Sequence, residues 1–193
     1  IYGTPPQGRA DYAFWQHIVR SMKPDTGRCA ILFPHGVLFR DEEAAMREKL
    51  IEHDVLECVL GLGPNLFYNS PMEACVVICR MSKPPERRGR VLFINAVNEV
   101  ARERAQSFLS EEHIEKIVEA YRTYEDREGF ARVAESSEIQ ANGGKLSLPL
   151  YVRGANGNGN GACERISLKQ SIADWMESSA ALRESMDELF TLL

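Results

Sequence analysis

Short apolar runs alternate with amphipathic segments through the first hundred residues. Residues 28–33, 55–62 and 72–80 are continuous apolar runs bounded by turn formers, and they predict buried strands. Residues 41–53 predict a helix between the first two strands, because three acidic residues open it where the helix dipole is positive. The pattern therefore predicts an α/β unit.

A further helix is predicted before these elements. Asp11 is placed to cap its first turn, and Phe14, Ile18 and Met22 recur at helical spacing to form its apolar face, with Trp15 and Val19 beside them. Residues 23–27 are turn formers that end it.

The connection between the second and third predicted strands sets their relative direction. It holds about ten residues, fewer than a parallel crossover needs, so these strands are predicted to be antiparallel neighbours. This order of elements, which runs helix, strand, helix, strand and antiparallel strand, predicts the C-terminal part of a Rossmann-like sheet whose last strand is reversed. Residues 1–96, including a strand at 91–96, are assigned to this α/β unit, as the far half of a doubly wound domain.

The rest of the chain is predicted to form an extension, a linker and a C-terminal helix. Within the extension, 97–153, a helix is expected at 110–124 and an edge strand or extended strap at 146–152. Residues 154–161 (GANGNGNG) form a flexible linker. The apolar face expected for the helix at 110–124 comprises Ile114, Ile117, Val118 and Tyr121.

Residues 162–193 carry a coiled-coil-like apolar seam with alternating spacings of four and three. We expect this helix to pack against a helix of another subunit, although folding back on its own domain is the alternative. The seam consists of Leu168, Ile172, Trp175, Ser179, Leu182, Met186, Leu189 and Leu193.

Composition and charge narrow the class of protein. The chain has 193 residues, 44% hydrophobic and 26% charged, as in globular proteins, and no apolar run approaches the ~20 residues of a membrane helix. The net charge is −5, and residues 101–193 hold the whole deficit, with 11 basic and 16 acidic residues. A globally basic nucleic-acid binder is excluded, whereas a local phosphate-binding patch is not. Ile1 in place of Met suggests a fragment.

The cysteines and histidines indicate no metal site. Five cysteines without a C-x-x-C spacing favour reduced thiols in a cytoplasmic protein over a disulfide or metal site, and the four histidines show no ligand spacing. The cysteines are Cys29, Cys58, Cys75, Cys79 and Cys163.

Several segments that occur in order carry a family resemblance. They are GTPPQGRADYAFWQHIVRSMKP, GRCAILFPHGVLFR, LGLGPNLFYNSPMEACVVICR, RGRVLFINA and LSLPLYV. Over roughly residues 1–153 the chain closely resembles the C-terminal half of the modification subunit of type I restriction–modification systems. The resemblance implies an N6-adenine DNA methyltransferase that uses S-adenosylmethionine. Its implied partners are DNA, a DNA-specificity subunit and a second modification subunit, with a restriction subunit as a further candidate.

Two motifs that such chemistry requires are absent from these 193 residues. One is the glycine-rich cofactor loop, and the other is an Asn-Pro-Pro-aromatic motif that holds the flipped adenine. Residues 3–7 (GTPPQ) only imitate the second, since Thr4 lacks the amide and Gln7 is not aromatic. We therefore expect the chain to be inactive alone and to self-associate through an incomplete sheet.

The resemblance also suggests site residues. In the loop at 63–71, Phe67 and Tyr68 are expected to stack on the flipped adenine, although Phe67 could instead plug the top of the sheet. Phe14 corresponds to the cofactor's adenine pocket, with core packing as the alternative. His35, in the Pro-His-Gly break, is expected to shape a loop rather than act in catalysis.

A basic turn offers a second candidate contact with DNA. Lys83, Arg87, Arg88 and Arg90 are expected either to contact DNA phosphates or to form a solvated hairpin turn. The competing function is a non-enzymatic module that binds partners through its C-terminal helix. A small-molecule methyltransferase is a weaker third interpretation.

Overall fold

A computed structural model of the chain describes residues 2–68, 70–103 and 106–152. The chain divides into two compact units, Ile1–Gly159 and Asn160–Leu193, and every described residue belongs to the first. The predicted linker and the apolar seam from Leu168 to Leu193 lie outside the described residues.

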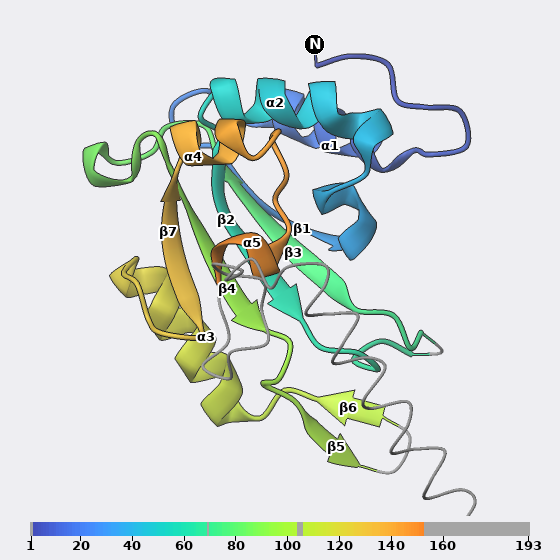
Figure 1. The fold of residues 1–193 in the computed structure, drawn as a ribbon, viewed down its shortest axis with the longest axis vertical. Helices are drawn as coiled ribbons and strands as arrows, with labels where there is room; N and C mark the ends of the chain where they lie inside the picture. Colours follow the sequence, from blue (N-terminus) through green and yellow to red (C-terminus); the bar gives the residue numbers. More distant parts are fainter. Residues whose placement is uncertain (1, 69, 104–105, 153–193) are drawn as a thin grey trace, which may run out of the picture. The chain divides into compact units, whose positions relative to one another are not determined.

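A five-stranded mixed sheet organises the fold in the order β1-β3-β2-β4-β7 (Figure 1). β3 runs antiparallel to both of its neighbours, β2 and β4 are parallel, and β7 is antiparallel to β4. The antiparallel pairing of β2 and β3 is as the short connection predicts, but β3 is not the last strand, because β4 and β7 extend the sheet. The strands are β1 (Arg28–Pro34), β2 (Leu56–Leu62), β3 (Ala74–Arg80), β4 (Arg90–Ala96) and β7 (Ala131–Glu135).

Among the described residues, four helices cover one face of this sheet. Trp15, Leu50, Ile139 and Tyr151 each bring a buried side chain from a different helix to a core that includes Val77 and Phe93. Tyr151 stacks on Phe93, with ring centroids 4.0 Å apart. The helices are α1 (Asp11–Ser21), α2 (Ala44–Glu52), α4 (Ser136–Ala141) and α5 (Leu148–Tyr151).

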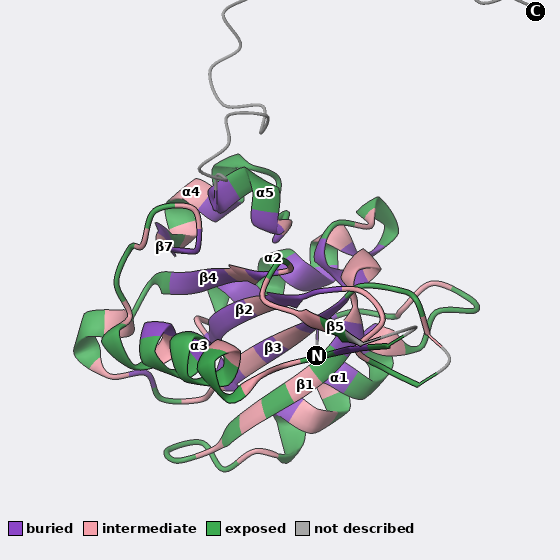
Figure 2. Cartoon of the chain, turned by 90° about the horizontal axis from the view of Figure 1, so that it is seen from below, coloured by how far each residue is buried: buried purple, intermediate pink, exposed green. Residues whose placement is uncertain are grey.

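The other face is covered by α3 (Glu111–Thr123) over β4. Ile117 and Ala120 are buried there, whereas Ile114 and Val118, expected on the same apolar face, remain exposed. β1 lies at the margin of the sheet, and α3 does not cover it. Figure 2 shows exposed positions along β1, whereas β2 and β4 are mostly buried. Leu32, which pairs with Val76 of β3, is 49% exposed.

The buried face of the first helix is centred on Trp15 and Val19, which lie beside the predicted stripe, and it excludes Phe14. Tyr12, Trp15 and Val19 are buried, whereas Phe14 is 64% exposed. Asp11 does not cap the helix, because its carboxylate pairs with Arg40 at 3.1 Å. The Tyr12 hydroxyl donates to the Val37 carbonyl at 2.9 Å, and this bond fixes the rotation of α1.

A buried arginine holds the turn after β1. Arg47 of α2 is fully buried and donates to the carbonyl oxygens of Arg40 at 2.7 Å and Gly144 at 3.1 Å. It therefore ties α2 to the residues after α4 and to the short helical turns η1 (His35–Leu38) and η2 (Asp41–Glu43).

The extension predicted at residues 97–153 is not separate from the sheet. β7 pairs with β4 along its length, so the expected boundary at residue 96 falls inside one compact unit. Residues 146–152 form no strand, since Leu148–Tyr151 is a short helix with Ser147 at its N-cap and a proline, Pro149, in its first turn. The remaining elements are β5 (Ala101–Glu103), β6 (Gln106–Phe108) and η3 (Pro85–Arg87). Within the described residues, no helix is both long and apolar enough to cross a membrane.

Candidate functional site

The aromatic loop, residues 63–73, connects β2 to β3 at the C-terminal end of β2 (Figure 1). β4 is parallel to β2 and ends at the same edge of the sheet. Ligands of open α/β sheets gather at this end of the parallel strands. The aromatic loop is therefore well placed to form one side of a binding site.

A tight turn presents the two aromatic rings of the loop. The amide of Ser70 donates to the Phe67 carbonyl at 3.1 Å, which leaves Tyr68 at the tip. Tyr68 is 83% exposed and Phe67 is 36% exposed. Because Phe67 is not buried, it does not plug the top of the sheet, and both rings are accessible to a planar ligand.

The short antiparallel pair β5–β6 contacts the aromatic loop. The Ser107 amide of β6 donates to the Asn65 carbonyl at 3.0 Å. At Gly63 a β-carbon would lie 2.5 Å from the Val97 carbonyl oxygen, so the backbones touch there. Sequence reasoning missed the β5–β6 hairpin, because three-residue strands are too short to show an alternating pattern.

A cavity of about 260 Å³ lies where β1 and β4 end. His35 Nδ1 lies 3.4 Å from Glu73 Oε2, so the turn after β1 is joined to the end of the aromatic loop. His35 Nε2 is buried without a hydrogen-bond partner among the described residues. The cavity is lined by His35, Leu38, Phe39, Glu73, Asn95, Val97, Asn98, Ser147, Leu148 and Pro149.

Phe14, expected near a cofactor or in the core, occupies neither place in the described residues. Its side chain projects from the outer side of α1 and is mostly exposed. It is also absent from the residues that line the cavity beside His35. The core alternative is therefore wrong, while a contact with the cofactor stays a prediction.

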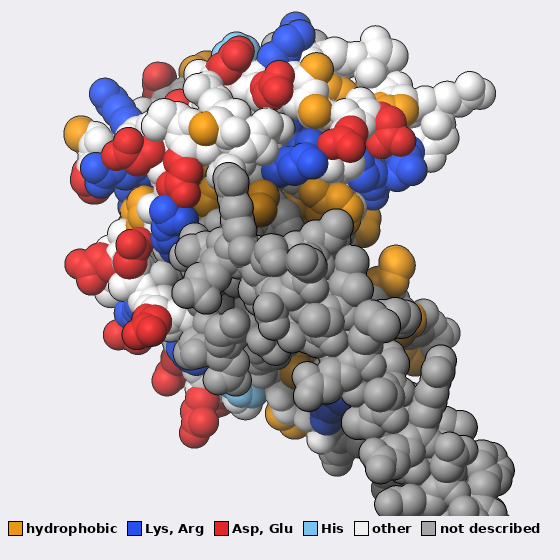
Figure 3. All heavy atoms as spheres, viewed as in Figure 1, with side chains coloured by type: hydrophobic (Ala, Val, Ile, Leu, Met, Phe, Trp, Pro, Cys, Tyr) orange, Lys and Arg blue, Asp and Glu red, His pale blue; other side chains and the backbone are white. Residues whose placement is uncertain are grey.

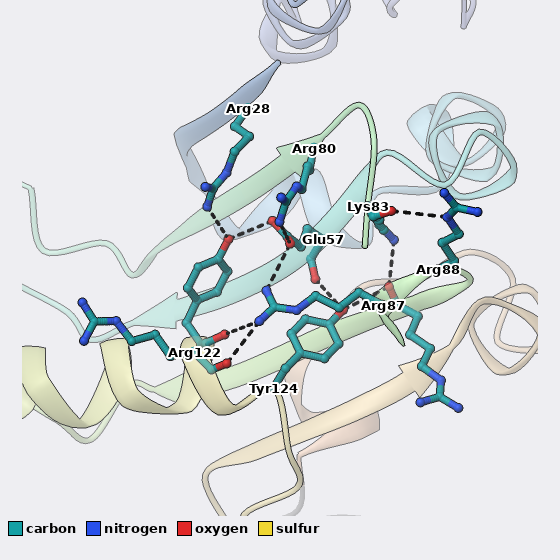
Figure 4. A network of polar contacts seen from close by, with 10 residues as sticks. Arg28, Glu57, Arg80, Lys83, Arg87, Arg88, Arg122 and Tyr124 are labelled. Carbon is teal, nitrogen blue, oxygen red and sulfur yellow. Dashed lines mark hydrogen bonds and ion pairs between the residues drawn. The ribbon is translucent and has the colours of Figure 1, made fainter. Parts of the chain in front are cut away.

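The basic turn lies at the opposite end of the sheet from the aromatic loop, and much of its charge is used internally (Figure 4). Glu57 is fully buried and accepts hydrogen bonds from Tyr121 at 2.8 Å, Arg87 at 3.1 Å and Arg80 at 3.2 Å. Burial alone would raise the pKa of the Glu57 carboxyl, but these hydrogen bonds outweigh it and lower the pKa. The guanidinium of Arg87 also lies over the Tyr124 ring, 4.3 Å from its centroid.

Lys83 is likewise committed to the interior. Its side chain is 1% exposed, and its ammonium donates to Asp54 at 2.6 Å and to the Arg90 carbonyl at 2.8 Å. Lys83 and Arg87 therefore hold the turn together and do not point at a phosphate. Arg88 and Arg90 are exposed, although Arg88 Nε donates to the Lys83 carbonyl at 3.3 Å and Arg90 lies 4.0 Å from Glu135. Of the four predicted residues, these two are the better placed to meet an outside anion.

The charge of the described surface is mixed. On the face seen in Figure 3, acidic and basic side chains alternate over the coloured part of the molecule. The described residues contain no group of three or more histidine, cysteine or acidic side chains arranged to hold a metal ion.

Comparison with known proteins places this geometry in a family. A sequence model described as N-6 DNA methylase matches residues 1–158. The chain is 35% identical over 191 residues to the type I restriction enzyme MjaVII methylase subunit of Methanocaldococcus jannaschii, covering 97% of this chain and 32% of the relative. It is 30% identical to the HindI methylase subunit of Haemophilus influenzae, covering 97% of this chain and 45% of the relative.

A solved structure agrees with the sequence matches. The type I restriction–modification system methyltransferase subunit from Streptococcus thermophilus superposes with a TM-score of 0.74 at 37% identity, over 78% of this chain and 32% of that one. The chain thus spans about a third of the length of the first relatives that it matches. The family match covers most of its residues, and the chain belongs to the N-6 DNA methylase family.

Proposed function

We propose that this chain is the C-terminal portion of a type I modification subunit, a site-specific DNA adenine-N6 methyltransferase. The whole protein transfers a methyl group from S-adenosylmethionine to an adenine flipped out of the duplex. The observation that carries the proposal is the aromatic loop, where Tyr68 is 83% exposed at the C-terminal edge of the sheet. A ring held there can stack on a base, which contributes roughly 1–3 kcal/mol.

The cavity at the C-terminal edge of the sheet does not by itself fit S-adenosylmethionine. The cavity beside His35 is about 260 Å³, below the ~300–1,000 Å³ typical of sites for ligands of that size. The sequence also contains neither the glycine-rich loop nor the Asn-Pro-Pro-aromatic motif. In the proposal, cofactor binding and methyl transfer depend on other parts of the whole protein, and this chain supplies scaffold and the base-side wall.

The edge strand β1 supports the same assignment. β1 pairs only with β3 among the described strands, and Leu32 is half-exposed on the face that α3 leaves uncovered. In the proposal, further parallel strands of a Rossmann-like methyltransferase sheet continue from β1. The C-terminal seam, Leu168 to Leu193, is proposed to meet the helices of the DNA-specificity subunit and of a second modification subunit in a cytoplasmic complex.

Substitution of Tyr68 in the full-length protein, assembled with its partners, tests the proposal. We expect Tyr68→Ala to lower kcat/KM for DNA methylation by roughly 5- to 150-fold, the equivalent of about 1–3 kcal/mol of lost stacking. Fluorescence of 2-aminopurine at the target position should rise less on binding of wild type than of Tyr68→Ala, because a ring stacked on the flipped base quenches it.

Two control variants separate stacking from loss of structure. Tyr68→Phe keeps the ring and should retain most of the activity, whereas Phe67→Ala tests the neighbouring ring in the same turn. Full activity in both Tyr68→Ala and Phe67→Ala, with unchanged 2-aminopurine fluorescence, would show that the aromatic loop does not touch the base.

A further inference from the structure

A side-chain contact joins the far end of the aromatic loop to the turn after β1. His35 Nδ1 lies 3.4 Å from Glu73 Oε2. The backbone pairing of β1 with β3 ends at Pro34 and Ala74, and His35 and Glu73 are the next residue on each strand. Side chains of opposite residues in antiparallel strands lie close enough to interact. The contact therefore continues the pairing one step beyond the sheet, where the aromatic loop enters β3.

His35 is the firmly held member of this pair. It opens η1, in which Val37 is fully buried and accepts a hydrogen bond on its carbonyl from the Tyr12 hydroxyl at 2.9 Å. The buried Arg47 donates to the same carbonyl at 3.4 Å. These bonds come from α1 and α2, so the imidazole starts from a backbone that two helices hold in place.

Glu73 is the member that restrains the aromatic loop. Among the described residues between 67 and 73, none has a buried side chain, so no packed apolar group fixes this arm of the loop. The other arm is restrained where the Ser107 amide donates to the Asn65 carbonyl. The Glu73 carboxylate supplies the corresponding restraint on the arm that leads into β3.

The pair does not depend on the open edge of the sheet. Both residues belong to this chain, and the cavity beside them is completed by Asn95 of β4 and Leu148 of α5. In the strand order, β4 is separated from β1 by β3 and β2. Further strands paired with β1 in the whole protein would therefore leave the contact between His35 and Glu73 in place.

We propose that His35 is a positioning residue for methyl transfer, which acts through Glu73 to hold the aromatic loop with Tyr68 against the flipped adenine, an inference that rests on the proposed function. A carboxylate only accepts hydrogen bonds, so Nδ1 of His35 carries a proton and donates to Glu73. That N–H is present in the neutral ring of this tautomer and in the charged ring, so the contact needs no change of protonation.

The test removes each partner of the contact in the full-length protein, assembled with its partner subunits. We expect His35→Ala and Glu73→Ala each to lower kcat for DNA methylation roughly three- to fivefold with little change in KM for DNA, because phosphate contacts dominate DNA affinity. This loss equals about 0.6–1 kcal/mol, the upper part of the range for an exposed ion pair. The double variant should be no slower than either single variant, since all three lose the same contact.

Two further measurements separate positioning from a general loss of structure. Adding His35→Ala to Tyr68→Ala should slow methylation no further, because the ring through which His35 acts is already gone. Hydrogen exchange at the Ser70 amide, which donates to the Phe67 carbonyl within the turn, should quicken in His35→Ala, while exchange at the Ser107 amide stays unchanged.

Conservative and control variants complete the design. His35→Asn keeps an N–H on the γ-carbon, where Nδ1 is attached, and Glu73→Gln keeps an acceptor oxygen, so both should retain most of the activity. His53→Ala removes a histidine that lies before the start of β2, at the end of the sheet opposite the aromatic loop, and should leave methylation and Ser70 exchange unchanged.

The outcomes distinguish this proposal from the proposed function. The role of His35 is overturned if His35→Ala methylates at the wild-type rate, if its effect multiplies with that of Glu73→Ala or Tyr68→Ala, or if Ser70 exchange does not change. A wild-type assembly that does not methylate DNA would instead overturn the proposed function, and Ser70 exchange would still decide whether His35 holds the loop.

Discussion

At the scale of single residues, Glu57 is the centre of the contacts that hold the basic turn to α3. We expect Glu57→Gln to lower the free energy of unfolding by roughly 3 kcal/mol at pH 7, because it leaves two arginines around a buried neutral group. Urea unfolding measures the change. Glu119→Gln, which removes an exposed partner of Arg127, should cost less than about 1 kcal/mol.

The same carboxylate gives the protein a defined acid sensitivity. Its pKa is lower in the folded state than the ~4.3 of an unfolded glutamate, so the unfolded state takes up the proton first as pH falls. The stabilisation is complete above the unfolded pKa and is lost as pH falls through the folded one. The stability of Glu57→Gln should therefore decline less below about pH 4.3, and an identical acid limb in both proteins would contradict the assigned role.

The fate of the basic turn explains what residue patterns cannot predict. Local sequence correctly indicates a charged hairpin turn, and a cluster of arginines and lysines usually faces water. The partners that turn Arg87 inward are Glu57, 30 positions away, and the carbonyls of α3. Tyr121 reaches the same carboxylate from 64 positions away. No window of neighbouring residues contains such contacts, so neither sequence alternative, phosphate contact or a solvated turn, describes Lys83 and Arg87.

At the scale of elements, the aromatic loop depends on close backbone contact at Gly63. A β-carbon there would lie 2.5 Å from the Val97 carbonyl oxygen and 2.7 Å from Val100 Cγ1. We expect Gly63→Ala to displace the loop from the β5–β6 hairpin and to reduce methylation by the full-length protein at least as much as Tyr68→Ala. Hydrogen exchange at the Ser107 amide, which donates to Asn65, should report the displacement locally.

Gly61 provides a matched comparison two residues earlier. A β-carbon at Gly61 would meet Leu148 Cδ1, the end of a side chain that can rotate, rather than a backbone atom. Gly61→Ala should therefore affect α5 and spare the exchange of Ser107. Equal exchange at Ser107 in wild type and Gly63→Ala would show that the aromatic loop does not need this contact.

Elements were predictable where one strong local pattern decides them. The continuous apolar runs correctly locate β1, β2 and β3, and β2 is buried on both faces, where a strand needs no alternation. β1 is the exception to the predicted burial, because it lies at the margin of the described sheet and most of its residues are at least partly exposed. β7 was missed because Ala131–Glu135 is short and carries two charged residues, and its pairing with β4 stabilises it as a strand. In α1, apolar residues recur at helical spacing on two adjacent faces, one that starts at Tyr12 and one that starts at Phe14. Only the hydrogen bonds of Tyr12 and Trp15 with distant residues select the face that is buried.

At the scale of the whole molecule, the apolar seam predicts assembly through the C-terminal segment. We expect Leu182→Asp to abolish association of the full-length protein with the DNA-specificity subunit proposed as its partner, because a charge in a heptad seam cannot be buried without a partner. Native mass spectrometry measures the complex, and circular dichroism checks that the α/β portion stays folded. Loss of folding with the complex intact would refute the assignment, and Ser179→Ala, a substitution in the same seam, should preserve assembly.

The marginal strand β1 allows the completeness of the sheet to be tested. If further strands and helices of the whole protein cover β1, Leu32 is buried there, although it is half-exposed among the residues described. Leu32→Lys should then lower the unfolding free energy of the full-length protein by roughly 2–3 kcal/mol, the value of a buried leucine side chain. Leu150→Lys, at a comparably exposed leucine of α5, should have little effect.

The isolated 193-residue chain should respond to Leu32→Lys in the opposite way. Its uncovered apolar edge promotes self-association, and a lysine on that edge opposes strand pairing, so the substitution should keep the chain monomeric. Sedimentation velocity should show concentration-dependent association of that chain, reduced by Leu32→Lys, and a neutral effect of Leu32→Lys in both proteins would mean that nothing packs on β1.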